Sequence, residues 1–255
     1  MTHSIDLNAD LGESFGAWTM GADEAMLDIV TSANIACGFH AGDPTVMDET
    51  VKTAIRKNVG IGAHPGYDDI RGFGRRRIQG IPPETLKAML IYQIGALQAI
   101  ARANGAEVRH VKVHGALGNV ASEDIEVATI YADAVKAMKG DIIVVAMAST
   151  ALETAVLKAD LPIAREIYAD RTYNDDGTLT LRSRPDALIH DEAYAADRVL
   201  RMIEERAVTS VNDVKVPVDP QTICVHGDNI AAVKMAEAVR KRLESAGVKV
   251  EKMGS

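Results

Sequence analysis

Short apolar runs alternate with longer amphipathic stretches along the whole chain. Seven of the runs have the length and composition of buried β-strands, and they cover residues 5–11, 32–37, 60–63, 110–113, 141–147, 163–168 and 222–225. Each run ends in polar or glycine-rich residues, and the stretches between the runs have helical periodicity. A strand followed by a helix, repeated in this way, is typical of parallel βα units.

The clearest predicted helix follows the third strand. Apolar residues recur at spacings of three and four from Leu86 to Ala101, with Pro83 before them and Gly105 after them. Ser122 is expected to open another helix, which closes near Gly140.

Thr150 and Glu153 have the spacing of a capping box at the start of a further helix. Residues 174–177 read Asn-Asp-Asp-Gly, which predicts a tight turn. Neither a linker nor a low-complexity tract interrupts the series. We therefore expect residues 1–255 to form a single α/β domain, and favour a closed parallel barrel of about seven units over an open doubly wound sheet.

The net charge and the number of cysteines indicate which partners and which cellular compartment to expect. The formal net charge of −8 would repel a phosphate polymer or an anionic membrane, so we expect no nucleic-acid partner and no membrane. The amino-terminal residues lack a basic and apolar leader, and no run approaches the length of a membrane span. Only two cysteines occur, Cys37 and Cys224, both in predicted strands. A cytoplasmic location is therefore expected.

Polar side chains gather where the predicted strands end. In a parallel barrel these ends converge on one mouth, which is where such barrels carry their chemistry. The expected catalytic residues are Asp10, His40, His64, Lys112, His114, His226 and Asp228. The expected substrate contacts are Asn8, Glu13, Asp43, Arg75, Asp170 and Arg171.

Four of the histidines share one setting. A single histidine after a strand is more often a hydrogen-bonded loop residue than a catalyst. Here, however, His40, His64, His114 and His226 all lie beside glycines at predicted strand ends. Glycine lets the backbone approach a ligand closely, so the recurrence favours a functional site. The other histidines, His3, His110 and His190, lack this setting and are expected to be structural.

Lys112 stands in an otherwise apolar strand, where an unpaired ammonium group would be costly. We therefore expect Lys112 to have a buried partner or a catalytic role, unless its side chain extends out of the lower rim of the barrel. The arginine-rich residues 71–77 follow the third strand, and Arg75 there is a candidate for binding an anionic group, although such runs are often solvated surface.

Several nucleotide and metal motifs are missing from the sequence. There is no phosphate-binding loop of the Gly-x-x-x-x-Gly-Lys type, no kinase glycine loop and no His-Glu-x-x-His or paired Cys-x-x-Cys spacing. A structural zinc site is therefore not expected. A set of Asp and His residues at several strand ends can still hold one divalent cation, and Asp10, His40 and His64 are the first candidates.

Five motifs connect the chain to a known family. They are Asn-Ala-Asp-Leu-Gly-Glu-Ser-Phe-Gly at 8–16, Asn-Ile-Ala-Cys-Gly-Phe-His-Ala-Gly-Asp-Pro at 34–44, Gly-Ala-His-Pro-Gly-Tyr at 62–67 with Gly-Phe-Gly-Arg-Arg at 72–76, His-Gly-Ala-Leu at 114–117, and the pair at 169–173 and 224–229. With these motifs the chain resembles, over almost its whole length, the LamB/YcsF family, the A subunits of 5-oxoprolinases. One departure is Gly118, where members of the family usually have tyrosine.

The resemblance implies a distorted (β/α)7 TIM-like barrel, similar to the glycoside hydrolase and deacetylase superfamily. It also implies the ATP-dependent opening of 5-oxoproline to glutamate in a complex with subunits B and C. Since the chain shows no nucleotide-binding motif, we expect ATP to be bound by, or together with, the partner subunits.

Roles for individual residues follow from this reaction as hypotheses. Asp10 or His40 would act as general base on water, and His114 or His64 would protonate the departing nitrogen. Lys112 and an arginine of residues 71–77 would neutralise negative charge. Two alternatives stay open: a metal-dependent amidase or deacetylase that acts alone, and a subunit that binds a small acid without converting it.

Overall fold

In the computed structural model, which describes residues 4–226 and 230–254, seven parallel strands form a closed barrel. The strands are β1 (Ser4–Leu11), β2 (Ser32–Ala36), β3 (Gly60–His64), β4 (His110–Lys112), β5 (Ile143–Ala146), β6 (Ile163–Tyr168) and β9 (Thr222–Cys224). Each strand pairs with the next, and β9 pairs with both β6 and β1, which closes the ring. The predicted parallel barrel and its seven strands are confirmed.

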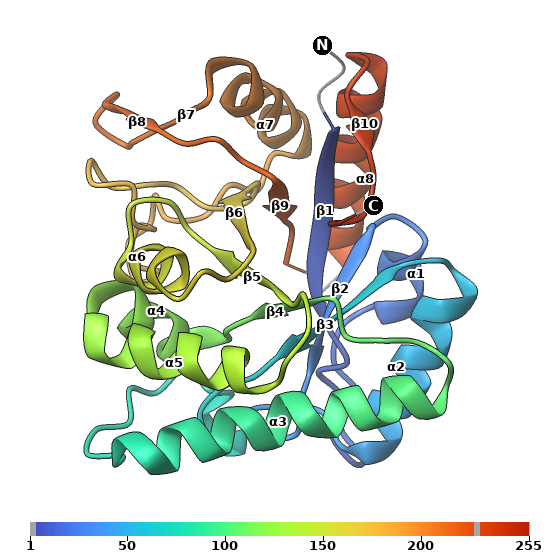
Figure 1. Ribbon diagram of the computed structural model, residues 1–255. Coiled ribbons are helices and arrows are strands. Elements are labelled where there is room, and N and C mark those ends of the chain that lie inside the picture. Colours follow the sequence, from blue (N-terminus) through green and yellow to red (C-terminus); the bar gives the residue numbers. More distant parts are fainter. Residues whose placement is uncertain (1–3, 227–229, 255) are drawn as a thin grey trace.

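Helices cover the outside of the strands (Figure 1). They are α1 (Asp23–Leu27), α2 (Pro44–Arg56), α3 (Pro83–Ala103), α4 (Gly115–Glu123), α5 (Ile125–Ala137), α6 (Ala151–Lys158), α7 (Glu192–Glu205) and α8 (Ile230–Ser245). A short 3-10 helix, η1 (Ile70–Gly72), lies in the loop between β3 and α3. The long helix predicted around residues 86–101 is thus confirmed as α3.

Two small additions complete the fold. The strands β7 (Ala207–Thr209) and β8 (Lys215–Pro217) form an antiparallel hairpin between α7 and β9. The short strand β10 (Lys249–Val250) pairs in parallel with the start of β1. The helix α8 leads to it, so the end of the chain lies against its beginning (Figure 1).

The start of α5 corrects one expectation. Ser122 does not open this helix, because it lies inside α4. The N-cap of α5 is Asp124, whose carboxylate accepts hydrogen bonds from the backbone N–H groups of Glu126 and Val127. A carboxylate at an N-cap also interacts favourably with the helix dipole. The capping prediction for α6 is confirmed, since the Thr150 hydroxyl accepts from the backbone of Glu153.

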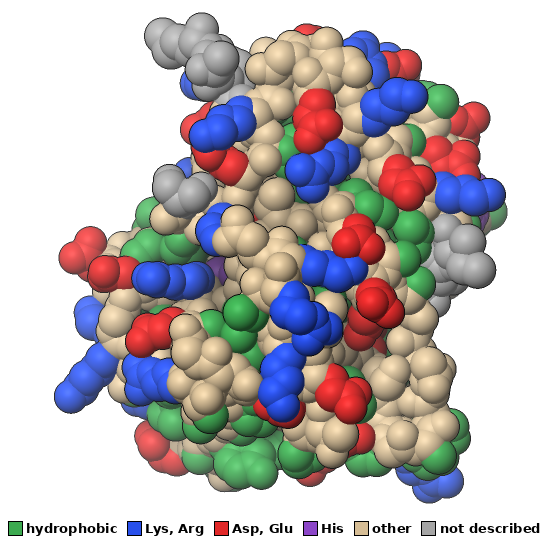
Figure 2. All heavy atoms as spheres, turned by 90° about the vertical axis from the view of Figure 1, so that its right-hand side faces the viewer, with side chains coloured by type: hydrophobic (Ala, Val, Ile, Leu, Met, Phe, Trp, Pro, Cys, Tyr) green, Lys and Arg blue, Asp and Glu red, His purple; other side chains and the backbone are tan. Residues whose placement is uncertain are grey.

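The core consists of aliphatic side chains between the barrel strands and the helices. Residues such as Leu7 and Ile35 on the strands and Leu90 and Leu97 on α3 are completely buried. None of the helices in the described part of the chain is long and apolar enough to cross a membrane. Figure 2 shows a face where acidic and basic side chains are interspersed rather than separated by sign.

Candidate active site

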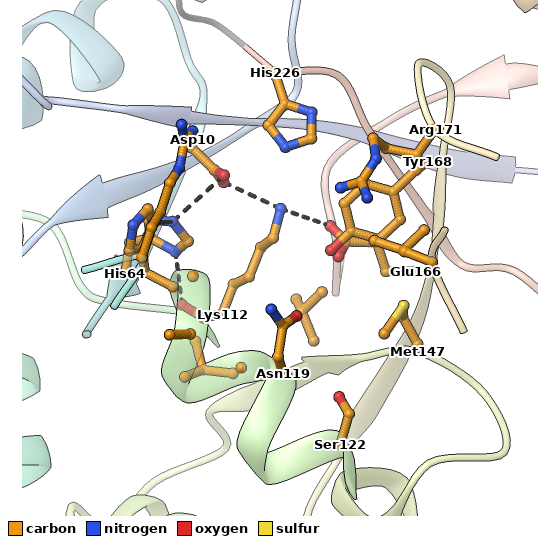
Figure 3. Close-up of a pocket in the computed structure, with 18 of the residues that line it drawn as sticks. Asp10, His64, Lys112, Asn119, Ser122, Met147, Glu166, Tyr168, Arg171 and His226 are labelled. Carbon is orange, nitrogen blue, oxygen red and sulfur yellow. Dashed lines mark hydrogen bonds and ion pairs between the residues drawn. The ribbon is translucent and has the colours of Figure 1, made fainter. Parts of the chain in front are cut away.

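A cavity of about 470 Å³ lies at the carboxyl ends of the barrel strands. Eight of the residues predicted from the sequence line it: Asp10, Glu13, His64, Arg75, Lys112, His114, Arg171 and His226. The lining also includes residues that the sequence did not single out, among them Asn119, Ser122, Glu166, Tyr168 and Arg182. Figure 3 shows their side chains from β1, β4 and β6 directed toward a common space.

Lys112 is the central charged group of this cavity. Its Nζ atom lies 3.1 Å from Asp10 Oδ1 and 2.9 Å from Glu166 Oε1, as the dashed lines in Figure 3 indicate. The same ammonium group lies 2.9 Å from the sulfur of Cys224 and over the ring of Tyr168. Lys112 is therefore buried inside the barrel between two carboxylates, and the alternative of a side chain that leaves through the lower rim is wrong.

This arrangement fixes the charges of the groups involved. Burial alone would lower the pKa of Lys112, but the charges of Asp10 and nearby groups outweigh it and hold that pKa well above its usual value. Burial likewise opposes ionisation of Asp10, yet His64 and Lys112 keep the Asp10 pKa well below its usual range. The cavity thus presents a cation held by carboxylates at neutral pH.

Three histidines stand beside this charged chain. His64 lies 3.4 Å from Asp10 through its Nε2 atom, and the same atom lies 3.0 Å from His114 Nδ1. The ring of His40 stacks on that of His114, with centroids 3.7 Å apart and planes 4° from parallel. Glu13 Oε1 lies 3.6 Å from His40 Nε2. These four side chains form what we call the histidine cluster: Glu13, His40, His64 and His114.

A glycine makes this close packing possible. Gly74 has a left-handed φ of 61°, and a Cβ atom there would lie 2.7 Å from both the His114 ring and the Cβ of His40. The preceding residue, Phe73, accepts a hydrogen bond through its carbonyl from His114 Nε2, 2.8 Å away. The loop after β3 therefore presses its backbone directly against the two histidines.

The side chains of the histidine cluster are almost completely buried, which changes their acid–base properties. Burial, together with the nearby His64, lowers the pKa of His114 to about 3. Burial and the neighbouring rings also hold the pKa of His40 well below its usual value. Glu13 is affected in the opposite sense, since burial and the charge of Asp10 raise its pKa to about 8. The imidazoles of His40 and His114 are therefore neutral, and a neutral imidazole has a lone pair that can bind a cation.

A second histidine–carboxylate pair lies across the cavity. His226 Nδ1 lies 2.7 Å from Asp170 Oδ2, and its Nε2 lies 2.9 Å from the guanidinium of Arg182. Because Arg182 can only donate, Nε2 accepts and Nδ1 carries the proton that is given to Asp170. Arg171 lines the same side, and its guanidinium donates to the carbonyl of Thr180.

The arginines of residues 71–77 have different roles. Arg76 and Arg77 form ion pairs with other side chains, and Arg75 lines the cavity. Arg76 donates through Nε to both oxygens of Asp69, at 2.9 and 3.1 Å, and Arg77 pairs with Glu123 on the surface. Arg75 instead lies over the ring of Phe73 and lines the cavity. Of these arginines, Arg75 is the one placed to meet a negatively charged ligand.

Four other predicted site residues in the described part of the chain do not line the cavity, and one of them, Asp170, meets it only through its contact with His226. Asn8 is buried inside the barrel, where it donates to Glu166 and Thr222. His40 belongs to the histidine cluster behind the cavity wall, and Asp228 lies outside the described residues.

Asp43, the fourth, also differs from its expected position. Its carboxylate caps α2 by accepting from the backbone of Thr45 and Val46, and it also accepts from Gly16. A carboxylate engaged by three backbone N–H groups has a structural function in a loop, and Asp43 is not among the residues that line the cavity.

Glu166 is the most important residue that the sequence analysis missed. It is buried in β6, and it contacts both Lys112 and Asn8. The signal was present, because a glutamate inside a predicted strand is as unusual as the lysine at 112. Alternation along the strand places Glu166 and Tyr168 on the same inward face.

A comparison with protein families matches nearly the whole chain. A family model described as the LamB/YcsF family matches residues 5–255. The chain belongs to the LamB/YcsF family.

Relatives of this family member are similar over nearly their full length. A protein from Rhodopseudomonas palustris (strain ATCC BAA-98 / CGA009), named as the A subunit of 5-oxoprolinase, is 50% identical over 246 residues, which is 96% of this chain and 97% of the relative. Another protein of that name, from Coprothermobacter proteolyticus, is 50% identical over 98% of this chain and 95% of its own length.

Solved structures support the same conclusion. The lactam utilization protein from Thermus thermophilus superposes with a TM-score of 0.92 at 43% identity, covering 97% of this chain and 99% of that one. A protein from Enterococcus faecalis V583 has a TM-score of 0.58 at 14% identity over 99% of this chain and 98% of its own, which shows a shared fold alone.

Proposed function

We propose that this chain is the lactam-handling subunit of an ATP-dependent 5-oxoprolinase, which converts 5-oxo-L-proline to L-glutamate. The observation that carries the proposal is the 50% identity to the A subunit of a 5-oxoprolinase over 97% of that protein's length. The cavity supports it independently, because it combines cationic groups for a carboxylate or phosphate with imidazoles and carboxylates for proton transfer.

The chemistry explains why ATP is needed. A γ-lactam is a poor electrophile, and ring closure is favoured over the open amino acid. Transfer of the γ-phosphoryl group of ATP to the lactam oxygen would activate the ring carbon. Water then adds to that carbon, the carbon–nitrogen bond breaks as the nitrogen takes up a proton, and a second water releases phosphate from the resulting acyl phosphate. The products are glutamate, ADP and phosphate.

The described side chains can serve each of these steps. Asp10 lies on the cavity wall as a carboxylate paired with Lys112, where it would accept a hydrogen bond from the attacking water and orient it. Of the two histidines considered for giving a proton to the departing nitrogen, His64 is the better candidate, because the lowered pKa of His114 leaves that imidazole neutral. Lys112 and Arg75 would stabilise negative charge that develops on the lactam or on its phosphate.

Partner subunits complete the proposal. The relatives carry the letter A in their subunit names, and a lettered name of that kind implies further subunits. We assign the binding of ATP to subunits B and C, alone or together with this chain, in line with the lack of a nucleotide-binding motif in the sequence. We also place the complex in the cytoplasm, since Cys37 and Cys224 are both buried free thiols.

The test is a reconstitution. The chain would be purified alone and with its two partner subunits, and phosphate and glutamate would be measured with and without 5-oxoproline. We expect the isolated chain to release no phosphate and the complex to release phosphate only when the lactam is present. Glutamate formed by the partner subunits without this chain would contradict the proposal. Glutamate formed by the isolated chain without ATP would identify a stand-alone amidase instead.

A further inference from the structure

The histidine cluster contains buried nitrogen atoms that have no hydrogen-bond partner, and its possible metal-ligand atoms lie close together. The possible ligand atoms of Glu13, His40, His64 and His114 all lie within 4.8 Å of one another. They come from the loops after β1 and β2, from the end of β3 and from the N-cap residue of α4, two positions after β4. This set differs from the trio of Asp10, His40 and His64 that the sequence suggested, because the possible ligand atom of Asp10 groups with those of Cys224 and His226 instead.

The backbone fixes the tautomers of two of these imidazoles. His64 Nδ1 lies 2.7 Å from the carbonyl oxygen of Lys112, and His114 Nε2 lies 2.8 Å from that of Phe73. A carbonyl oxygen can only accept, so each of these ring nitrogens carries the hydrogen. When both rings are neutral, the opposite nitrogens, His64 Nε2 and His114 Nδ1, present lone pairs to each other across 3.0 Å.

Two lone pairs at this distance repel each other unless a positive charge lies beside them. A proton shared between these two nitrogens would relieve the repulsion, but it would leave the buried ring nitrogens of His40 without a partner. His40 adds to the imbalance, because neither of its ring nitrogens has a hydrogen-bond partner although the side chain is only 1% exposed. Buried polar atoms without partners are rare in folded proteins.

The spacing suits a small cation. In a tetrahedral zinc site with bonds of about 2.0–2.1 Å, ligand atoms lie roughly 3.3 Å apart. Here His64 Nε2 and His114 Nδ1 are 3.0 Å apart, and Glu13 Oε1 lies 3.9 Å from His114 Nδ1. Carbonyl groups behind the imidazoles, as found here for both histidines, also occur in metal sites, where they orient the ligands.

We propose that Glu13, His64 and His114 bind a divalent transition-metal ion, with zinc as the best match to these donors, and that His40 is the fourth ligand. The ring of His40 is parallel to that of His114, so it has to turn about its side-chain bonds to point a nitrogen at the ion. Imidazole and carboxylate donors favour zinc and its neighbours over magnesium or calcium. The role of the ion in the reaction rests on the proposed function: it would polarise the lactam carbonyl or activate water.

Metal binding can be measured without the reaction. Untagged full-length protein, stripped of metal and dialysed at neutral pH, would be titrated with Zn²⁺ by calorimetry and with Co²⁺ by visible absorption. We expect one equivalent of Zn²⁺ and the absorption bands of four-coordinate Co²⁺. The variants His64→Ala, His114→Ala and Glu13→Gln should each weaken binding at least about a hundredfold, and His40→Ala should weaken it less. The exposed His190→Ala variant is the matched control and should bind like the wild type.

Three results would overturn the proposal. The wild type could fail to bind either ion at micromolar concentrations. The cluster variants could bind as tightly as the wild type while circular dichroism shows that they are folded. Finally, His226→Ala could abolish binding when Glu13→Gln does not, which would move the site to the neighbouring group of Asp10, Cys224 and His226. Reconstituted lactam-dependent phosphate release is a separate measurement, so failure of the proposed function would leave these outcomes unchanged.

Discussion

Two layers of buried polar residues occupy the inside of the barrel, and they differ in how completely they are hydrogen-bonded. The inner layer consists of Asp6, Asn8, Ser32, Asn34, His110 and Thr222. Asp6 accepts from the hydroxyl groups of Thr31, Ser32 and Thr222, while Asn34 bridges Asn8 and His110. The histidine cluster at the mouth has no such closure, since both nitrogens of His40 lack partners.

This difference separates residues that build the barrel from residues that are available for chemistry. A polar network in which the donors and acceptors are matched ties strands together and leaves nothing for a ligand. Groups that remain unmatched in a buried site cost free energy, and their persistence points to a ligand that completes them. Lys112 lies between the layers, because it contacts Asp10 at the mouth and Glu166 beside Asn8.

The largest expected effect comes from that connecting residue. Lys112→Met would leave the carboxylates of Asp10 and Glu166 buried without their cation, and we expect a loss of ~3–5 kcal/mol in the free energy of unfolding. Urea denaturation at neutral pH measures it. The double variant Lys112→Met/Glu166→Gln is the control and should recover part of the loss. If Lys112→Met lowers the free energy of unfolding by less than about 1 kcal/mol, the ion pairs of Lys112 with Asp10 and Glu166 do not stabilise the fold as proposed.

Substitution of a histidine at the mouth of the barrel should lower turnover rather than the free energy of unfolding. His114→Ala is expected to lower the lactam-dependent turnover of the reconstituted complex at least about a hundredfold, the low end for a lost acid or base. His190→Ala, on the exposed surface, serves as the matched control. Near-normal turnover with a folded His114→Ala variant would instead favour the alternative of a subunit that binds a small acid without converting it.

Asp6 in the inner layer should make the free energy of unfolding depend on pH. Burial raises the pKa of Asp6 to about 6 from its ordinary value of 3.8. A carboxyl group with a raised folded pKa stabilises the protein fully below the unfolded pKa, and this contribution is lost as pH rises through the folded value. The wild type should therefore lose on the order of 2 kcal/mol relative to Asp6→Asn between about pH 4 and pH 6.

Chemical denaturation of both proteins across this pH range is the measurement. The control is Asp43→Asn, because backbone hydrogen bonds at the helix cap lower the pKa of the Asp43 carboxyl group, which should not show this loss. A constant difference between wild type and Asp6→Asn from pH 4 to pH 6 would contradict the raised pKa of Asp6.

The smallest effect concerns Asp43, which belongs to neither layer. Since its carboxylate caps α2, Asp43→Ala should cost ~1 kcal/mol of stability. Because the side chain lies outside the cavity lining, turnover of the complex should fall by less than about threefold, well short of the loss of a catalytic group. A rise in KM for the lactam with unchanged stability would restore Asp43 to the substrate contacts that the sequence suggested.

The sequence by itself determined the architecture and several of the residues that line the cavity. Apolar runs and helical periodicity depend on local chain geometry, so they located the seven barrel strands and the long helix α3. The position of polar residues at strand ends then identified Asp10, His64, Lys112 and His114, because parallel strands direct their carboxyl ends to one mouth.

Only the tertiary structure decided which atoms meet. Glu166 and Asn8 are 158 residues apart in the chain, and their contact exists because β9 closes the ring between β6 and β1. Local patterns carry no information on such pairings, nor on which nitrogen of His64 or His114 faces a carbonyl group. Burial, which sets the protonation of these groups, depends in the same way on the packing of distant segments such as the backbone of Gly74 against both His40 and His114.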